Sequence, residues 1–305
     1  MEEIKTIFEK IKECNNWGID VIRINETKKE GKKYIKAQIE NIKRSGITSL
    51  VEDISNNHLE NIIDKYDSIQ EYTDIIEENV IYKLDKNSIL VKEEYEKIIE
   101  CILSTDVERN PLELKSDCYL LKGKIKIHNE YKNVILISMS NPVKTIRNCF
   151  VKNNTEFEDI SGKVLVLKEN IDVIFYDNNI YFFNTKGEKL FNIEKTKKVL
   201  CKNKLAYIEN ADIVDNFEEF EKVAMKGQNP SKFLCFNNSR LELLKENSNK
   251  EKYATLFGLE INDNKFTSSS EENCVKLIKV LCGKGNLDPF ENKPIENSGV
   301  KGWYK

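Results

Sequence analysis

KVLVLKENIDVIFYDNNIYFFNTKGEKLF, residues 163–191, is the stretch that decides the expected fold. It contains two short apolar runs, residues 171–176 and 180–184, which are rich in β-branched and aromatic side chains. Asp177-Asn178-Asn179 separates them, and such residues tolerate left-handed turn conformations, so the two runs predict a tight β-hairpin. Residues 163–167 come just before as a third short strand, and together the three strands predict a meander.

The residues before this meander extend the predicted sheet. Leu121, Gly123 and Ile125 alternate with lysines at 122, 124 and 126, so one face of the strand is apolar and the other carries three ammonium groups. Residues 133–139 form the next apolar run. We therefore expect at least five strands in a mostly antiparallel sheet.

The flanking segments combine helices with further strands. Near the start, Ile4, Phe8 and Ile11 recur at helical spacing, and residues 19–24 and 34–39 are predicted to form a pair of strands. After residue 191 the apolar spacing is mainly helical, with Ser269 and Glu272 as a capping box for a late helix. The fold class is α+β.

The expected domain boundary lies near residue 110, where Asn110-Pro111 biases the chain toward an extended or turn conformation. We expect an acidic N-terminal α/β domain at residues 1–110, and a mostly antiparallel sheet with packed helices and a basic centre at residues 111–305. No stretch approaches the roughly 18 uncharged apolar residues of a spanning helix. The sequence thus predicts a cytoplasmic protein.

Charge is distributed unevenly along the chain. Residues 1–110 contain 17 basic and 24 acidic side chains, a balance of −7, whereas residues 111–210 contain 17 and 12, a balance of +5. The total of −3 hides this contrast. Because contact with nucleic acid depends on local clustering, the middle third is where a polyanion would bind.

Motifs for the common catalytic and nucleotide-binding sites are missing from the sequence. It has no phosphate loop, no dinucleotide-binding glycine motif and no G-x-S-x-G elbow, and its eight cysteines lack C-x-x-C spacing. The only two histidines, His58 and His128, lie far apart, which argues against a metal site or a catalytic triad built on histidine. We assign no catalytic residue, no cofactor and no metal.

Two carboxylate sets are nevertheless worth weighing as nuclease-like sites. Asp20 with Glu26 and Lys28 could hold a divalent metal and poise a water, and Asp172 with Asp177 could form a second pair. The simpler interpretation of the first set is a solvated surface pair. The simpler interpretation of Asp177 is that its side chain accepts hydrogen bonds from its own backbone in a turn.

Lysines concentrate in two stretches of the middle third. Between residues 121 and 150, six basic side chains accompany a single acid, and residues 186–204 add seven lysines with two glutamates. If both stretches belong to one sheet and the helix after it, their charges converge on one face, which phosphate backbones select. The alternative is a solubilising face of a lysine-rich protein. If the charges converge on one face, we assign these residues to DNA binding: Lys122, Lys124, Lys126, Lys144, Arg147, Lys195, Lys197 and Lys198.

Two features refine this hypothesis. Arg147 is one of only five arginines, and a guanidinium can donate two parallel hydrogen bonds to one phosphate, which an ammonium cannot. Tyr131 and Tyr207 flank the basic stretches and either pack in the core or stack on bases.

Tyr119-Leu120-Leu121 leading into KGKIKI, then NVILISMSNPVKTI and the meander of residues 163–191, together resemble the domain of KwaB, the soluble component of the Kiwa anti-phage system. The resemblance covers residues 115–305 and rests on the pattern and order of elements. It implies a cytoplasmic, dimeric protein that binds DNA and works beside the membrane protein KwaA. Such a protein interferes with phage DNA replication and late expression, and the resemblance implies that its partner recruits it to the inner face of the membrane.

The expected function is therefore that of a defence effector that binds DNA without sequence specificity. Two alternatives stay open: a metal-dependent nuclease effector, and an adaptor that binds protein and not DNA. The resemblance fixes no DNA-contacting residue, so the site assignment depends on charge alone.

Overall fold

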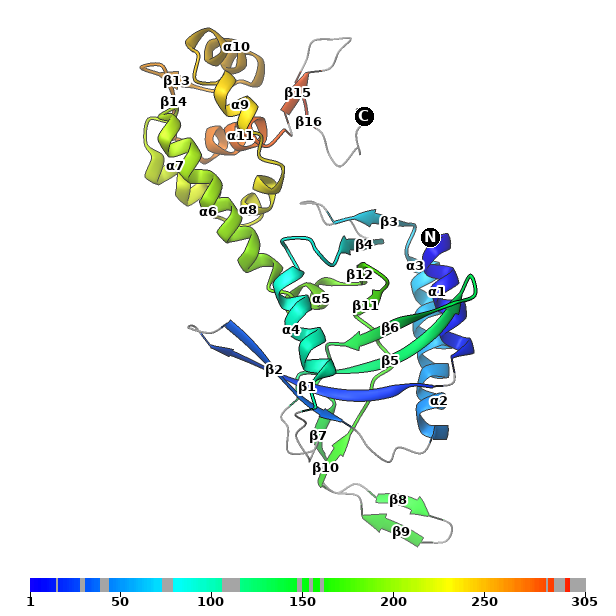
Figure 1. Ribbon diagram of the computed structural model, residues 1–305. Helices are drawn as coiled ribbons and strands as arrows, with labels where there is room; N and C mark the ends of the chain where they lie inside the picture. Colours follow the sequence, from blue (N-terminus) through cyan, green and yellow to red (C-terminus); the bar gives the residue numbers. More distant parts are fainter. Residues whose placement is uncertain are drawn as a thin grey trace. The chain divides into compact units, whose positions relative to one another are not determined.

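The computed structural model describes residues 1–14, 16–27, 31–38, 44–72, 79–105, 116–146, 150–153, 156–159, 162–283, 285–287 and 294–296. Contacts divide the chain into two compact units. The first comprises Met1–Tyr72 and Glu78–Asn192, and the second comprises Thr73–Glu77 and Ile193–Lys305. Figure 1 shows the elements of each unit.

A large sheet forms the centre of the first unit. Within the described ranges it has eight strands in the order β2-β1-β5-β6-β11-β12-β4-β3, and all neighbours are antiparallel except β3 and β4. This confirms the α+β class with a mostly antiparallel sheet. The strands are β1 (Gly18–Thr27), β2 (Gly31–Gln38), β3 (Ser68–Glu71), β4 (Val80–Asp85), β5 (Cys118–Ile127), β6 (Glu130–Ser138), β11 (Val173–Tyr176) and β12 (Asn179–Phe182).

Helices cover both faces of this sheet. On one face lie α1 (Glu2–Glu13), α2 (Arg44–Asp53), the π-helix η1 (Ile54–Leu59) and α3 (Glu60–Lys65), as Figure 1 shows. The predicted stripe of α1, Ile4, Phe8 and Ile11, is buried there against Tyr119 and Leu121 of β5. Because strand side chains alternate between faces, the sheet buries apolar residues on both sides.

The second face packs against α4 (Lys92–Leu103) and α5 (Thr185–Leu190). Aromatic rings carry this contact. Phe175 of β11 lies 5.2 Å from Tyr95 of α4 and 5.8 Å from Phe191, centroid to centroid, and Phe182 of β12 lies 5.5 Å from Phe191. Tilted ring pairs at these distances add to the stabilisation from burial alone.

Strand pairing crosses the boundary that the sequence suggested near residue 110. Val21 of β1 pairs with Tyr119 of β5, and Ile180 of β12 pairs with Leu84 of β4. A division at residue 110 would break both pairings, and the contacts instead divide the chain after Asn192. Residues from both sides of position 110 belong to one hydrophobic core, so the composition shift there does not mark separate cores.

The predicted hairpin of the deciding stretch is confirmed, whereas its third strand lies elsewhere. Tyr176 pairs with Asn179, and Asp177 takes the positive φ of 56° that the turn requires. β10 (Gly162–Leu165) pairs instead with β7 (Val143–Ile146) in a separate two-stranded sheet, and β8 (Phe150–Asn153) pairs with β9 (Glu156–Asp159). β6 pairs with β11 on the edge where the third strand of the meander was expected. The period-two pattern of the sequence does not indicate which strand lies there.

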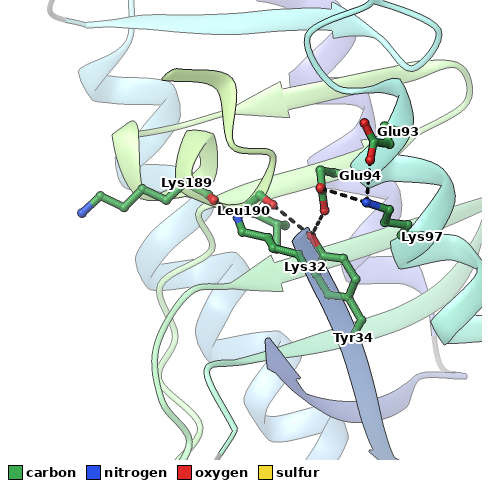
Figure 2. A network of polar contacts seen from close by, with 7 residues as sticks. All are labelled: Lys32, Tyr34, Glu93, Glu94, Lys97, Lys189 and Leu190. Atoms are coloured by element: carbon green, nitrogen blue, oxygen red, sulfur yellow. Dashed lines mark hydrogen bonds and ion pairs between the residues drawn. The ribbon is translucent and has the colours of Figure 1, made fainter. Parts of the chain in front are cut away.

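A network of buried polar groups anchors β2 to the two helices on its face, as Figure 2 shows. Lys32 Nζ donates to the carbonyl oxygens of Lys189 and Leu190 at the C-terminal end of α5, the latter at 3.1 Å. Tyr34 Oη donates to Glu94 Oε2 of α4 at 2.6 Å. Burial, followed by this contact with Glu94, raises the pKa of Tyr34 far above its ordinary value.

Lys36 of β2 has the same role at the end of α4. Its Nζ donates to the carbonyl oxygens of Ile102 at 2.8 Å and Ser104 at 2.6 Å, and the residue is only 5% exposed. A cation at a helix C-terminus meets carbonyls that have no intrahelical donor, which stabilises the helix end.

The second unit is mainly helical, as expected. Its elements are α6 (Ile193–Ala211), α7 (Phe217–Ala224), α8 (Asn229–Lys232), the 3-10 helix η2 (Phe233–Cys235), α9 (Asn238–Leu243), α10 (Asn247–Phe257), α11 (Glu271–Leu281), and the hairpins β13 (Ile261–Asn262) with β14 (Lys265–Phe266) and β15 (Gly285–Leu287) with β16 (Pro294–Glu296). The cap of α11 is Ser270, whose side chain accepts from Asn273 N, and not Ser269. Gly283 follows that helix with φ of 75°, a conformation that suits glycine.

Candidate nucleic-acid interface

The hairpin of β5 and β6 brings the candidate residues into register. Its turn residues, His128 and Asn129, both have positive φ, at 49° and 66°, which is the geometry of a two-residue hairpin turn. Ile127 therefore pairs with Glu130, which aligns Lys126 with Tyr131 and Lys124 with Asn133. Because paired residues share a face, these last four side chains lie on one side of the hairpin; we call them the β5–β6 basic ribbon.

The opposite side of the same hairpin is buried at Gly123 and Ile125, whereas Glu130 beside the turn is exposed. Ile125 lies in the core, and Gly123 lies so close to Trp17 that an added Cβ would stand 2.7 Å from the indole ring. Glu130, the single acid of this basic stretch, alternates onto the side opposite Tyr131. The predicted division into an apolar and a basic face is therefore present.

All four residues of the basic ribbon are exposed, and Tyr131 is 72% exposed. Lys126 Nζ lies 5.9 Å from the centroid of the Tyr131 ring, a cation–π distance. Within the described part of the chain, neither Lys124 nor Lys126 has a carboxylate oxygen within 4.0 Å, so their charge is not locally neutralised.

Lys122 has a different environment, although it belongs to the same strand. Its Nζ lies 2.5 Å from Asp20 Oδ2, and the Asp20 carboxylate is almost fully buried. The pairing of Gly18 with Lys122 brings these side chains together from strands that are far apart in sequence. Lys122 is therefore committed to a buried carboxylate, which lowers its availability to a phosphate.

A groove borders the basic ribbon where β5 extends beyond its pairing with β1. It has a volume of about 540 Å³. α1 and the connection to β1 form one side and the hairpin forms the other. The lining residues are Lys10, Glu13, Cys14, Asn16, Lys124, Ile125, Lys126 and Tyr131.

Lys144 is exposed on β7, away from the basic ribbon. Figure 1 shows β7 and β10 at the end of the sheet opposite the β5–β6 turn. The structure does not bring Lys144 together with Lys124 and Lys126. Arg147, the arginine singled out in the sequence, lies outside the described residues.

The lysines of α6 belong to the second unit and differ in exposure. Lys195 and Lys198 are exposed, whereas the side chain of Lys197 is only 2% exposed, with its Nζ 3.5 Å from Glu194 Oε1. Lys197 is thus not presented to solvent. The proposed convergence of α6 with the sheet lysines stays a prediction.

The two flanking tyrosines are both on the surface. Tyr207 is 52% exposed, and Lys204 Nζ lies 5.6 Å from its ring centroid, an arrangement close to that of Tyr131 and Lys126. Of the two expectations for these residues, core packing is wrong, and the rings are accessible for stacking.

The first nuclease-like set is not assembled. Asp20 is buried and ion-paired, whereas Glu26 is exposed six residues further along the same strand, about 20 Å away at the rise of a β-strand. Lys28 lies outside the described residues. Two carboxylates at this separation cannot share one metal ion.

The second carboxylate pair is divided between two structural roles. Asp172 accepts hydrogen bonds from Met139 N and Asn184 Nδ2, both at 2.6 Å, whereas Asp177 forms an ion pair with Lys132 at 3.0 Å. Across the described ranges, no cluster of three His, Cys, Asp or Glu side chains could hold a metal ion.

Comparison with models of known protein families, with curated proteins and with solved structures finds no match. Where the structure describes the chain, none of its helices combines the length and the apolar character needed to cross a membrane.

Proposed function

We propose that this protein binds DNA without sequence specificity, through phosphate contacts made by the β5–β6 basic ribbon. The observation that carries the proposal is the pair of exposed ammonium groups, Lys124 and Lys126, on one face of a paired hairpin, with no carboxylate within 4.0 Å in the described part of the chain. Uncompensated lysines release counterions when they meet phosphates, and this supplies most of the affinity in non-specific binding.

The arrangement favours backbone contact over base reading. Base readout in the grooves depends most often on bidentate side chains such as arginine, whereas lysine acts as a point charge. The two lysines of the ribbon lie at alternate positions of one strand, so their Cα atoms are about 7 Å apart. That is close to the spacing of successive phosphates along a strand, so each lysine can meet its own phosphate.

The cellular role that we propose follows from the resemblance to KwaB. It is that of an anti-phage defence effector that interferes with phage DNA replication and late expression. We propose further that it acts as a homodimer and is recruited to the membrane by a KwaA-like partner. The exposed basic ribbon supports the DNA-binding part of this role.

The direct test is to measure the binding of the intact protein to labelled duplex DNA at increasing salt. Reversal of Lys124 and Lys126 to Glu should weaken binding to every sequence about equally and lower the salt slope by about two, one for each phosphate contact. A matched control reverses Lys222 and Lys245, exposed lysines that each have a glutamate oxygen at 2.6 Å and should matter little.

The outcomes separate the rival functions. Unchanged affinity in the Lys124/Lys126 variant would overturn the site assignment, and a second variant with Lys144 and Arg147 reversed would then test the other cations. If the wild-type protein has no affinity for DNA, the adaptor function stands instead. DNA cleavage that requires magnesium would establish the nuclease alternative.

A further inference from the structure

The groove beside the basic ribbon has a feature that phosphate contacts alone do not use. β1 pairs with β5 only from Ile22–Cys118 to Gly18–Lys122, whereas β5 continues to Ile127. The last residues of β5 therefore border an open groove of about 540 Å³. This volume lies within the usual range of roughly 300–1,000 Å³ for ligand sites.

The chemistry of the groove combines an aromatic ring with cations. Tyr131 lines it with 72% of its surface exposed, and Lys124 and Lys126 line it beside the ring. Among the described residues that line it, the one acid is Glu13, whose carboxylate already pairs with Lys10 at 2.6 Å. A flat ring beside ammonium groups of unneutralised charge is the combination that binds single strands, with bases stacked on the ring and phosphates on the cations.

The exposure of the ring also distinguishes between forms of nucleic acid. In a duplex each base is stacked between its neighbours, so its face is not available to a protein side chain. Only an unpaired base can cover Tyr131. The lysines bind phosphates of single strands and duplexes alike, whereas stacking on the tyrosine adds affinity only for the single strand.

We propose that this groove binds single-stranded nucleic acid, with one base stacked on Tyr131 and the adjacent phosphates on Lys124 and Lys126. This inference rests on the proposed function, since it assigns the preferred ligand of the same ribbon. It goes beyond that function because it predicts a preference of form and a residue that acts on bases and not on charge.

The experiment compares a 15-nucleotide oligothymidine with a duplex of the same length, using the full-length protein. The single strand should bind more tightly than the duplex. Tyr131→Ala should weaken binding to the single strand by roughly 5- to 150-fold, the range for loss of one stacked base, and should leave duplex binding within about twofold. Tyr131→Phe keeps the ring and should retain the affinity.

Two controls separate stacking from a structural role of the ring. Leu103→Ala removes an exposed apolar side chain that does not line the groove and should leave single-strand binding unchanged. An abasic oligonucleotide has the phosphates without the bases, so the wild-type protein should bind it no better than Tyr131→Ala binds oligothymidine.

The inference is overturned if single strand and duplex bind equally, or if Tyr131→Ala weakens both forms to the same extent. In either case the proposed DNA binding through Lys124 and Lys126 would still stand. Absence of all binding to either form would instead remove the proposed function itself, so the two failures are distinguishable.

Discussion

Replacement of Lys36 by Met removes an ammonium group that joins the edge strand β2 to the C-terminal end of α4. The side chain is 5% exposed, and its Nζ donates to Ile102 O at 2.8 Å and Ser104 O at 2.6 Å. Methionine has a similar length and no charge. The substitution therefore tests the two hydrogen bonds and the charge while it keeps the space filled.

The size of the effect follows from opposing contributions. Leaving a buried carbonyl without its donor costs about 1–3 kcal/mol, and a cation at a helix C-terminus contributes up to about 2 kcal/mol in partly buried geometry. Relief from burying the charge offsets part of this loss. We expect a net loss of about 2 kcal/mol, which for a unit of this size corresponds to a fall in melting temperature of roughly 4–8 °C.

The assay is thermal and urea unfolding of the full chain, followed by circular dichroism. Lys33→Met is the matched control, because Lys33 lies on the same strand and its side chain is exposed. The control should stay within about 0.5 kcal/mol of the wild type. If Lys36→Met is no less stable than Lys33→Met, the buried lysines of β2 do not hold the helices, and the reasoning is refuted.

Two further predictions concern other buried groups. Asp20→Asn removes the counter-charge of Lys122, so DNA binding should become tighter and its salt slope steeper by about one. Asp177→Asn is the control, because it frees Lys132 on the other face of the hairpin and should change neither the affinity for DNA nor the salt slope. Titration of DNA binding with salt for both variants tests this. Burial, followed by a hydrogen bond to a glutamate of α1, raises the pKa of Tyr181 above its usual 10.0, so its stabilising contribution is complete below pH 10 and is lost as the pH rises further, by about 1.4 kcal/mol per pH unit. Urea unfolding at pH 9, 10 and 11 should show a shallower decline for Tyr181→Phe, and an unchanged decline would contradict this origin.

Short-range patterns in the sequence predicted much of the local structure. The alternation of Leu121, Gly123 and Ile125 with lysines predicted the two faces of β5, and the residues at 177–179 predicted the turn of the β11–β12 hairpin. Period and turn chemistry are properties of a few neighbouring residues, so the sequence contains them directly. The same is true of the helical stripe on α1.

Pairings between distant segments could not be predicted in this way. β1 lies next to β5, and β4 lies next to β12, although the pairs are separated by about a hundred residues. Nothing local in β10 indicates that β7 is its neighbour. Strand partners depend on which edges remain open in the whole sheet, and this determined both the domain division and the fate of the third meander strand.

The same limit explains why charge along the chain overestimates charge on the surface. A count of lysines treats each one as free, yet Lys36 serves a helix end, Lys122 serves Asp20, and Lys197 is buried. Each of these uses depends on a tertiary neighbour. What distinguishes Lys124 and Lys126 is position: both lie where β5 has passed the end of β1, so no buried carboxylate of that strand can reach them. A basic stretch therefore becomes a candidate binding surface only where the register of the sheet leaves its cations uncompensated, and in this sheet that place is the tip of the β5–β6 hairpin.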